Sequence, residues 1–340
     1  MKVAVVILTW NGAEMLRQFL PGVLSCSEGE GIEVIVADNA SSDETLSVLQ
    51  KEFSSVRVIR MDQNYGFAGG YNRALEQVEA EYVVLLNSDV EVTPNWLQPL
   101  IHYMDAHPEV AACQPKLRSW RNKKCFEYAG AAGGFLDRYG YPYCRGRILG
   151  TVEEDLGQYD SICPVFWATG AALFIRLRDY REVGGLDSRF FAHMEEIDLC
   201  WRLRSRNRGI VCIPESVVYH VGAATLKESP RKTFLNFRNN LLMLYKNLPE
   251  KELKSVMRVR CLLDYVAAVR FLLKFDFGNF SAVLKARREF RKLQKDYLSC
   301  REENLSVAVL KNIPERTPHF LIWEYYVRGK KTYQYLKNSK

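Results

Sequence analysis

The stretch from Tyr82 to Val92, YVVLLNSDVEV, constrains the fold of this chain more than any other segment. Its apolar residues form a continuous run, which is typical of a strand buried on both faces in a parallel sheet. The run ends abruptly at Asn87, Ser88 and Asp89. Because ligands of open α/β sheets bind at the carboxyl ends of strands, Asp89 is a candidate site residue. The alternative is an ordinary turn, since Asn, Ser and Asp favour turns for local reasons.

Earlier segments repeat this alternation of strand and helix. Short apolar runs predict three further strands, at residues 3–8, 32–37 and 56–60. Helical spacing of apolar residues follows the first two runs, and a glycine-containing loop at 62–70 opens a third helix. This order indicates βαβ units and a mostly parallel central sheet flanked by helices, an α/β fold. Since three of the four strands end in polar residues, we expect three loops to meet at one edge.

The following part of the body is less regular. Thr93 and Pro94 predict the N-cap and first position of a helix that runs to about residue 106. A strand is predicted at 110–114, and the segment 116–160, rich in Gly, Tyr and Arg, is interpreted as hairpins or loops. Further strands are expected at 210–213 and 217–222.

Charge divides the chain into two parts. Residues 1–229 carry 23 Lys and Arg against 30 Asp and Glu, a net charge of −7. Residues 230–340 carry 24 against 10, a net charge of +14. The second part also changes to long amphipathic patterns, which predict helices at 231–247, 250–275, 280–300 and 318–337. We therefore expect a C-terminal helical appendage on the α/β body.

The basic appendage is expected to face a negative partner, for which anionic lipid or a nucleic acid would serve. No run of 18 uncharged residues occurs in it, so a transmembrane helix is not expected. Basic residues beside Leu, Phe and Tyr are typical of helices that lie on a membrane surface. The alternative is that these helices pack on the body with solvated basic faces. No nucleic-acid-binding module is recognisable, so nucleic acid is not expected as a partner.

The nine cysteines are scattered and form no CxxC pair. Their spacing fits neither a zinc site nor a secreted disulfide framework, which favours a reducing compartment. The apolar run at Met1–Thr9 is too short for a signal peptide and leads straight into Trp10, Asn11 and Gly12. A cytoplasmic protein is expected.

Four segments, in this order, resemble glycosyltransferase family 2, and within it the branch that includes rhamnosyltransferases. They are VVILTWNG at 5–12, VADNASSD at 36–43, QNYGFAGGYNRA at 63–74 with LLNSDVEV at 85–92, and HMEEIDLCWR at 193–202 with YHVG at 219–222. The resemblance spans about residues 2–245. Each motif alone is weakly specific, but their combination in order is strong.

The resemblance implies a GT-A fold in residues 1–229 that binds a nucleotide-sugar, followed by the helical region 230–340. It implies an inverting, metal-dependent transfer, with rhamnosyl from dTDP-rhamnose as the first choice of donor. The implied acceptor is a saccharide or a lipid-linked saccharide, in cell-surface polysaccharide synthesis at the inner face of the cell membrane. The appendage would then lie on that membrane peripherally.

The family's nucleotide-binding motifs match two loops of this chain. Asp38 matches the acid that hydrogen-bonds the base, with Thr9 and Asn11 completing the pocket. Its alternative role is an N-cap for the following helix. The second loop resembles the donor-sugar and pyrophosphate cradle, in which glycines let backbone N–H groups approach phosphate. It contains Asn64, Gly66, Phe67, Ala68, Gly69 and Asn72. Glycine-rich turns are also common without any ligand.

Asn87, Ser88 and Asp89 occupy the place of the family's DxD metal motif. Mg²⁺ or Mn²⁺ prefers oxygen ligands and would bridge the diphosphate of the donor. Asn87 departs from DxD and brings no charge, although this branch often carries Asn there, so Asp89 would be the principal anion on the metal. His220 resembles the family's second metal ligand, and an imidazole suits Mn²⁺ better than Mg²⁺. The alternative for His220 is a satisfied core histidine.

Glu195 and Glu196 resemble the acidic pair that opens the acceptor-side helix. An inverting transfer needs one base to take the proton of the acceptor hydroxyl, and the match places Glu196 in that role with Glu195 as second choice. Acids also favour a helix N-terminus through the dipole alone. Trp167, Thr169 and Gly170 resemble the acceptor floor, where an aromatic face would meet the sugar; Trp167 could equally belong to the core.

Two other classes of function compete with a transferase. A non-catalytic nucleotide- or glycan-binding homologue at a membrane is supported by Asn87 alone, and the acidic pair and His220 argue against it. A Rossmann oxidoreductase is disfavoured because no GxGxxG motif follows the first strand.

Overall fold

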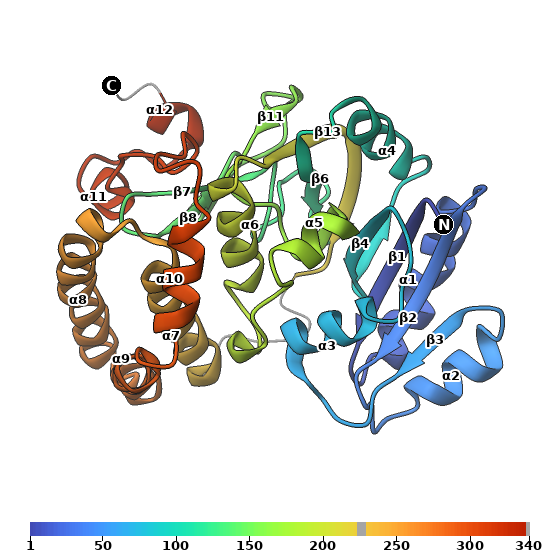
Figure 1. The fold of residues 1–340 in the computed structure, drawn as a ribbon, viewed down its shortest axis with the longest axis horizontal. Helices are drawn as coiled ribbons and strands as arrows, with labels where there is room; N and C mark the ends of the chain where they lie inside the picture. The colour runs from blue at the N-terminus through green and yellow to red at the C-terminus, as the bar shows by residue number, and fades with distance from the viewer. Residues whose placement is uncertain (223–228, 338–340) are drawn as a thin grey trace.

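A computed structural model describes residues 1–222 and 229–337 of the chain. Within these ranges, a nine-stranded sheet runs through the body in the order β11-β13-β6-β12-β4-β1-β2-β3, with β5 pairing to β13 (Figure 1). Its strands are β1 (Val3–Thr9), β2 (Ile32–Asp38), β3 (Arg57–Arg60), β4 (Tyr82–Asn87), β5 (Val90–Val92), β6 (Val110–Ser119), β11 (Cys163–Pro164), β12 (Ala172–Arg176) and β13 (Gly209–His220).

Helices cover the sheet and connect its strands (Figure 1). Those of the body are α1 (Ala13–Cys26), α2 (Thr45–Glu52), α3 (Gly66–Leu75), α4 (Leu97–Ala106), α5 (Leu177–Glu182) and α6 (Glu195–Ser205). A second, four-stranded antiparallel sheet occupies much of the predicted hairpin region. Its strands are β7 (Gly134–Leu136), β8 (Pro142–Cys144), β9 (Arg147–Ile148) and β10 (Thr151–Val152).

The central sheet is mostly parallel, as predicted. The neighbours of β1, namely β2 and β4, both run parallel to it, and β2 runs parallel to β3. Thr9 lies opposite Asp38 and Leu8 lies opposite Asn87 in these ladders. The polar ends of three strands therefore meet at one edge of the sheet, and that prediction is confirmed.

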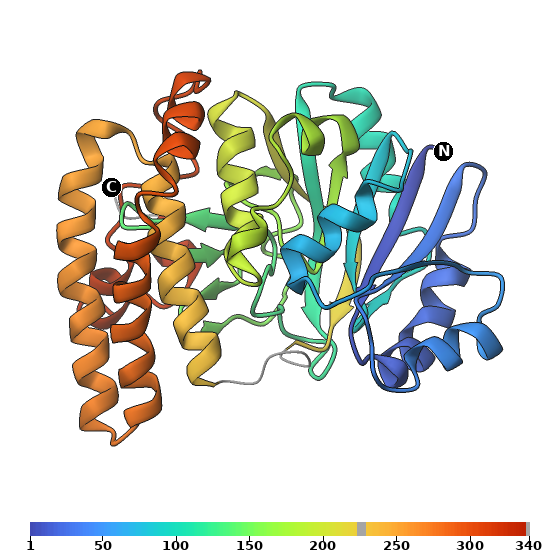
Figure 2. The same cartoon turned by 60° about the horizontal axis from the view of Figure 1, so that its bottom comes forward.

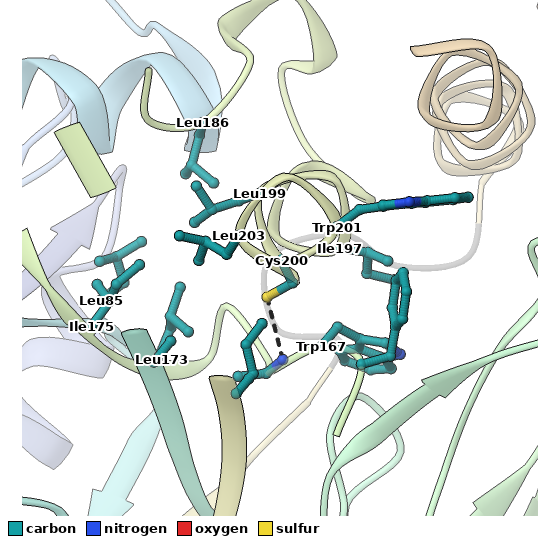
Figure 3. Packing of buried hydrophobic residues seen from close by; sticks show 14 of the residues in the cluster. Leu85, Trp167, Leu173, Ile175, Leu186, Ile197, Leu199, Cys200, Trp201 and Leu203 are labelled. Atoms are coloured by element: carbon teal, nitrogen blue, oxygen red, sulfur yellow. Dashed lines mark hydrogen bonds between the residues drawn. The ribbon is translucent and has the colours of Figure 1, made fainter. Parts of the chain in front are cut away.

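The strand at the centre of the prediction, β4, is buried on both faces. Val83 and Leu85 belong to one hydrophobic cluster, whereas Val84 and Leu86 belong to another. Alternation of this kind follows from the two-residue period of a strand. Helix α6 covers the first face, where its leucines point toward Leu85 (Figure 3). The residues on that face include Leu173, Ile175, Leu199 and Leu203.

Four predicted elements differ from the structure. The helix predicted at 280–300 is two helices, at Phe277–Leu293 and Leu298–Ser306, separated by a turn at 294–297. Thr93 is not the N-cap of a helix, because its hydroxyl donates to Val217 O of β13 at 2.7 Å and α4 begins only at Leu97, after a turn. The strands predicted at 210–213 and 217–222 form one strand, β13, with an irregularity between Ile213 and Val217. The helix predicted at 318–337 is two short helices, because the chain turns between them at Gly329, whose φ is +68°.

The C-terminal region forms a group of helices at the end of the molecule opposite β3 and α2 (Figures 1 and 2). They are α7 (Pro230–Asn247), α8 (Glu250–Leu273), α9 (Phe277–Leu293), α10 (Leu298–Ser306), α11 (Leu321–Tyr326) and α12 (Tyr333–Lys337). Residues 338–340 of the predicted appendage lie outside the described residues. Of the helices described, none combines the length and apolarity that crossing a bilayer requires.

Candidate functional site

The end of β13 lies beside the turn that follows β4. Antiparallel pairing places His220 opposite Val90, the residue after Asp89. The Nε2 atom of His220 is 3.2 Å from Asp89 Oδ1 and 3.3 Å from Asn87 Nδ2. Its other nitrogen, Nδ1, is 3.4 Å from Glu127 Oε1. Two motifs separated by more than a hundred residues therefore meet with their polar atoms in contact.

This group of side chains is buried and acidic. Asp89 is 3% exposed, Glu127 is 5% exposed and His220 is 6% exposed. Burial opposes the charged form of the imidazole, but hydrogen bonds and the charges of Asp89 and Glu127 outweigh it and raise the pKa of His220 to about 10. The predicted turn and the predicted site coincide here, because Ser88 and Asp89 form the turn between β4 and β5.

The donor set fits a divalent cation between Asp89 and His220. One carboxylate oxygen and one imidazole nitrogen face each other, and Glu127 lies where a carboxylate orients the second nitrogen of many metal-bound histidines. Ligation would require the proton on Nε2 to leave. Among residues 1–222 and 229–337, no three His, Cys, Asp or Glu side chains are arranged to hold a metal together. Two protein ligands leave the remaining positions open.

The ends of β1 and β2 form an adjoining loop pair. Asp38 is 1% exposed, and both its oxygens lie 3.3 Å from the backbone N of Ser41. Its alternative role as an N-cap is wrong, because α2 begins at Thr45, whose N–H donates to Asp43 instead. Asn11, at a φ of +51°, accepts from the N–H of Ser42 at 2.8 Å. The buried hydroxyl of Thr9 has no hydrogen-bond partner in the described structure.

The loop before α3 is joined to the end of β2 by Asn39. The amide of Asn39 donates to Asn64 Oδ1 and to Gly66 O, and its oxygen accepts from the N–H of Tyr65. Asn64 Oδ1 also accepts from the N–H of Gly66 at 2.8 Å. Gly66 has a φ of +71°, and a methyl group there would lie 2.5 Å from the ring of Phe191. The loop is therefore held against both β2 and the segment before α6.

Two N–H groups at the start of α3 are occupied by a neighbouring segment. Those of Phe67 and Ala68 donate to Phe191 O, at 2.7 and 3.3 Å. The side chain of Asn72, one turn further on, is engaged elsewhere: its oxygen accepts from Tyr180 Oη, and its amide donates to Leu186 O at 2.7 Å. Gly69 is also buried, facing Tyr65 and Ser188. In this conformation the predicted cradle is a contact between α3 and the segment 185–191.

Glu195 and Glu196 open α6, and within residues 1–222 and 229–337 no ion pair forms on their carboxylates. Glu195 is 4% exposed, and one oxygen of each side chain is buried without a hydrogen-bond partner in the described structure. Burial raises the pKa of both carboxyls, and the proximity of Glu196 raises that of Glu195 further. By contrast, Asp198 accepts from Arg202, Lys246 and Asn247. A raised pKa makes the carboxylates of the pair better proton acceptors than exposed ones, whereas Asp198 joins α6 to α7 through its hydrogen bonds.

The backbone before this pair is strained. Phe191, His193 and Met194 have φ values of +65°, +70° and +70°, which are uncommon for residues with side chains. Asn239 of α7, 0% exposed, holds the strained segment: its amide lies 2.9 Å from Phe190 O and 2.8 Å from the oxygens of Ala192 and His193. One buried side chain from the C-terminal region thus fixes the turn that delivers Glu195 and Glu196.

The predicted acceptor residues separate into two kinds. Trp167 is a core residue: it is 3% exposed and donates from Nε1 to Phe135 O at 3.0 Å (Figure 3). The backbone N of Thr169 donates to Gln114. Gly170 lies at the site, because a methyl group there would be 3.1 Å from Phe67 Cζ and 3.8 Å from Glu196 Cβ. Ala171, which follows Gly170, accepts a hydrogen bond at its backbone O from the N–H of Asn87.

Two residues that contact the candidate site could not be identified from any pattern in the sequence. Glu127 lies in a segment interpreted as loops, and only the fold brings it to His220. Asn239 lies in a helix far along the chain from the turn that it holds. Asn39 was more accessible to prediction, since it belongs to the polar end of β2.

Comparisons with known proteins identify a related family and a related fold. Residues 4–146 match the family model described as glycosyl transferase family 2. The chain is 25% identical over 240 residues to the N-acetylglucosaminyl-diphospho-decaprenol L-rhamnosyltransferase of Mycobacterium tuberculosis, covering 66% of this chain and 78% of that protein. Among solved structures, residues 1–349 of S. aureus TarS with UDP-GlcNAc align with a TM-score of 0.58 at 15% identity, covering 90% of this chain and 89% of that one.

A second solved structure, GalNAc-T7 with UDP, GalNAc and Mn²⁺, aligns with a TM-score of 0.58 at 14% identity, covering 88% of this chain and 56% of that one. At these sequence identities, the two structures support a conclusion about the fold only. That fold is of the GT-A type, as predicted.

Proposed function

Because residues 4–146 match the model of glycosyl transferase family 2, we propose that the chain belongs to this family and is a metal-dependent, inverting hexosyltransferase of cell-surface glycan synthesis. The observation that supports this most is the contact of Asp89 Oδ1 with His220 Nε2 at 3.2 Å, backed by Glu127. It joins the end of β4 to the end of β13 at the edge where ligands of α/β sheets bind.

In this proposal Asp89 and His220 hold the metal, and Glu127 orients the imidazole. A bound divalent ion such as Mn²⁺ would supply positive charge to the diphosphate of the leaving nucleotide. Asp38, Thr9 and Asn11 would bind the nucleotide, with Asn87 and Ser88 beside them. The residues of the α3 loop, 64–72, would contact the donor after rearrangement of the contact with Phe191, because that carbonyl occupies their N–H groups.

Glu196 is proposed as the base. The acceptor hydroxyl oxygen attacks the anomeric carbon, its proton passes to the Glu196 carboxylate, and the bond from that carbon to the diphosphate oxygen breaks with inversion. A pKa raised by burial makes this carboxylate a stronger base than an exposed one. Gly170 and Thr169 would border the acceptor, and Trp167 would support them from the core.

The donor we propose is dTDP-rhamnose, and the acceptor is a saccharide or lipid-linked saccharide. The support is the similarity to the mycobacterial rhamnosyltransferase, which is named for the transfer of L-rhamnose to N-acetylglucosaminyl-diphospho-decaprenol. Residues 1–229 would form the catalytic unit and residues 230–340 a helical region that lies peripherally at the inner face of the cell membrane.

A thermal-shift screen of nucleotide-sugars with Mn²⁺ tests the donor, because a ligand that binds only the folded state raises Tm. We expect dTDP-rhamnose to raise Tm and UDP-sugars not to. Transfer or donor hydrolysis should follow with that donor.

Asp89→Ala and Glu196→Gln should each lower the turnover rate roughly a hundredfold or more. The matched control is Glu215→Gln, an exposed carboxylate on the same strand as His220, which should retain activity. Full activity of both site variants would contradict the proposed function. Binding of a donor without turnover under any condition would favour the non-catalytic homologue.

A further inference from the structure

The exposed face of α8 changes character along the helix. In its first half this face carries Lys251, Lys254 and Arg258. In its second half, six exposed apolar side chains recur at spacings of three or four residues and so share one face, with Arg270 as the exposed charged residue of this half. They are Leu262 (65% exposed), Tyr265 (40%), Val266 (57%), Val269 (50%), Leu272 (39%) and Leu273 (75%). Two exposed phenylalanines follow the helix in the sequence, Phe275 (80%) and Phe277 (61%).

The opposite face of the same half-helix is charged and buried. Arg260 and Asp264 are 2% and 0% exposed. Asp264 accepts from Arg260 at 3.2 Å and from Arg287 of α9 at 2.5 Å, while Arg260 also donates to Asn240 of α7. A surface helix in water normally has the reverse arrangement, with its apolar face inward.

The inward charges prevent α8 from hiding its apolar face by rotating about its axis. Rotation would break the ion pairs of Asp264 and leave buried charges without partners, which costs several kcal/mol per pair. Eight exposed apolar side chains between Leu262 and Phe277 also exceed the scattered exposure that needs no explanation. The apolar face is therefore a fixed feature of the fold that calls for a covering partner.

The charge around this face identifies the partner. Between residues 250 and 293, the exposed charged side chains comprise nine basic residues and one acidic residue, Glu250. The basic ones are Lys251, Lys254, Arg258, Arg270, Lys274, Lys285, Arg288, Arg291 and Lys292. A second copy of this chain would bring like charges together, which disfavours self-association. A surface that is both apolar and anionic matches this region on both counts.

We propose that the second half of α8 and the turn into α9 bind the surface of an anionic lipid bilayer. Leu262, Val266, Val269 and Leu273 enter the boundary between headgroups and acyl chains, and the surrounding Lys and Arg contact anionic headgroups. In both views α8 forms the outer edge of the molecule, so the body does not obstruct this contact (Figures 1 and 2). The inference rests on the peripheral localisation in the proposed function, and names the surface responsible.

Vesicle co-sedimentation of the full-length protein tests the proposal without donor or acceptor. Binding is expected to phosphatidylcholine vesicles that contain phosphatidylglycerol, to weaken as salt is raised, and to be absent with phosphatidylcholine alone. Equal binding to both kinds of vesicle, or to neither, would overturn the proposal. Since no turnover is measured, failure here leaves the transferase assignment standing.

Leu273→Glu should lower vesicle binding roughly tenfold or more, because it removes apolar area and adds a negative charge. Leu156→Glu is the matched control, since Leu156 is 78% exposed on the body, and it should bind as the wild type does. Both variants should keep their Tm, because both positions are exposed. Equal loss in the two variants would contradict the proposal. A change from dimer to monomer in Leu273→Glu, with wild-type protein that ignores vesicles, would identify a second copy as the partner instead.

Discussion

Glu195 and Glu196, one of which is proposed as the base, lie where an ionised carboxylate lowers the stability of the fold. Glu195 is 4% exposed and Glu196 is partly exposed, and each has a buried oxygen without a hydrogen-bond partner in the described structure. Burial raises the pKa of Glu195, and the charge of Glu196 raises it further. Above the ordinary carboxyl range the unfolded chain has released a proton that the folded chain still holds, so the free energy of unfolding decreases as pH rises through this interval.

Glu195→Gln is therefore expected to stabilise the protein, and more at about pH 8 than at about pH 5, by on the order of 1 kcal/mol. The neutral amide removes the cost of ionising a buried carboxyl, and that cost is largest at high pH. Thermal unfolding at the two pH values measures the difference. Glu215→Gln, at an exposed position, should show no such dependence. An equal shift of Tm at both pH values for Glu195→Gln would contradict the explanation.

The start of α3 shows how one element depends on another. Gly66 has a φ of +71°, and an added methyl group would lie 2.7 Å from Phe191 O, the acceptor for Phe67 and Ala68. Alanine at 66 would be strained in itself and would displace the segment before α6. The approach of these two elements therefore requires glycine.

Gly66→Ala should lower the free energy of unfolding by roughly 2 kcal/mol or more. Gly22→Ala provides the comparison, since Gly22 lies inside α1 with nothing within 4 Å of an added methyl group. There alanine should be neutral or stabilising, by up to about 1 kcal/mol, through its higher helix propensity. Urea unfolding of the two variants measures both effects, and equal effects would show that contact with Phe191 is unimportant.

Helix α7 contributes to the site from outside the matched region. Asn239→Ala removes a donor from three carbonyls of the strained segment and should cost about 1–3 kcal/mol of stability. Because Glu195 and Glu196 follow that segment, we also expect kcat to decrease tenfold or more, with donor binding in the thermal-shift assay nearly unchanged. Asn236→Ala, a partly exposed position on the same helix, is the control. Loss of stability with an unchanged kcat would assign Asn239 a purely structural role.

Elements of this fold were predictable where one local pattern determined them. The strands β1, β2 and β4 follow from continuous apolar runs, and their polar ends indicated the edge of the sheet at which the candidate site residues would meet. Thr93 was predicted wrongly because β13, distant in sequence, accepts its hydroxyl. Glu127 and Asn239 could not be predicted for the same reason, since their contacts arise only from the tertiary structure. Local patterns determine strands and helices, whereas packing selects the partners of polar side chains.

At the scale of the whole molecule, the division of charge corresponds to a contact. Lys246 of the basic region donates to Asp187 and Asp198 of the acidic body, each at 2.8 Å. In the other direction, Arg204 of the body pairs with Glu315 at 2.6 Å. The two parts therefore neutralise some of each other's charge where they meet, while the exposed basic residues of α8 remain outside this contact.

The contact also makes the body dependent on residues 230–340. Asp198 is 0% exposed and would lose the partners Lys246 and Asn247, and Asp137, also 0% exposed, would lose the N–H of Leu321. The main hydrophobic cluster would lose residues from α7, among them Leu241, Leu242, Met243 and Leu244. Buried charge without partners and newly exposed core both destabilise the remaining fold.

We therefore expect residues 1–229 alone to be insoluble, or to lack a cooperative thermal transition, although they include the whole matched family region. Far-UV circular dichroism with thermal unfolding measures this, beside the full-length protein. Co-expression of residues 1–222 with residues 229–340 should restore a soluble complex, because packing rather than chain connection supplies the stability. A soluble fragment 1–229 with its own cooperative transition would instead establish an independent catalytic domain with a dispensable appendage.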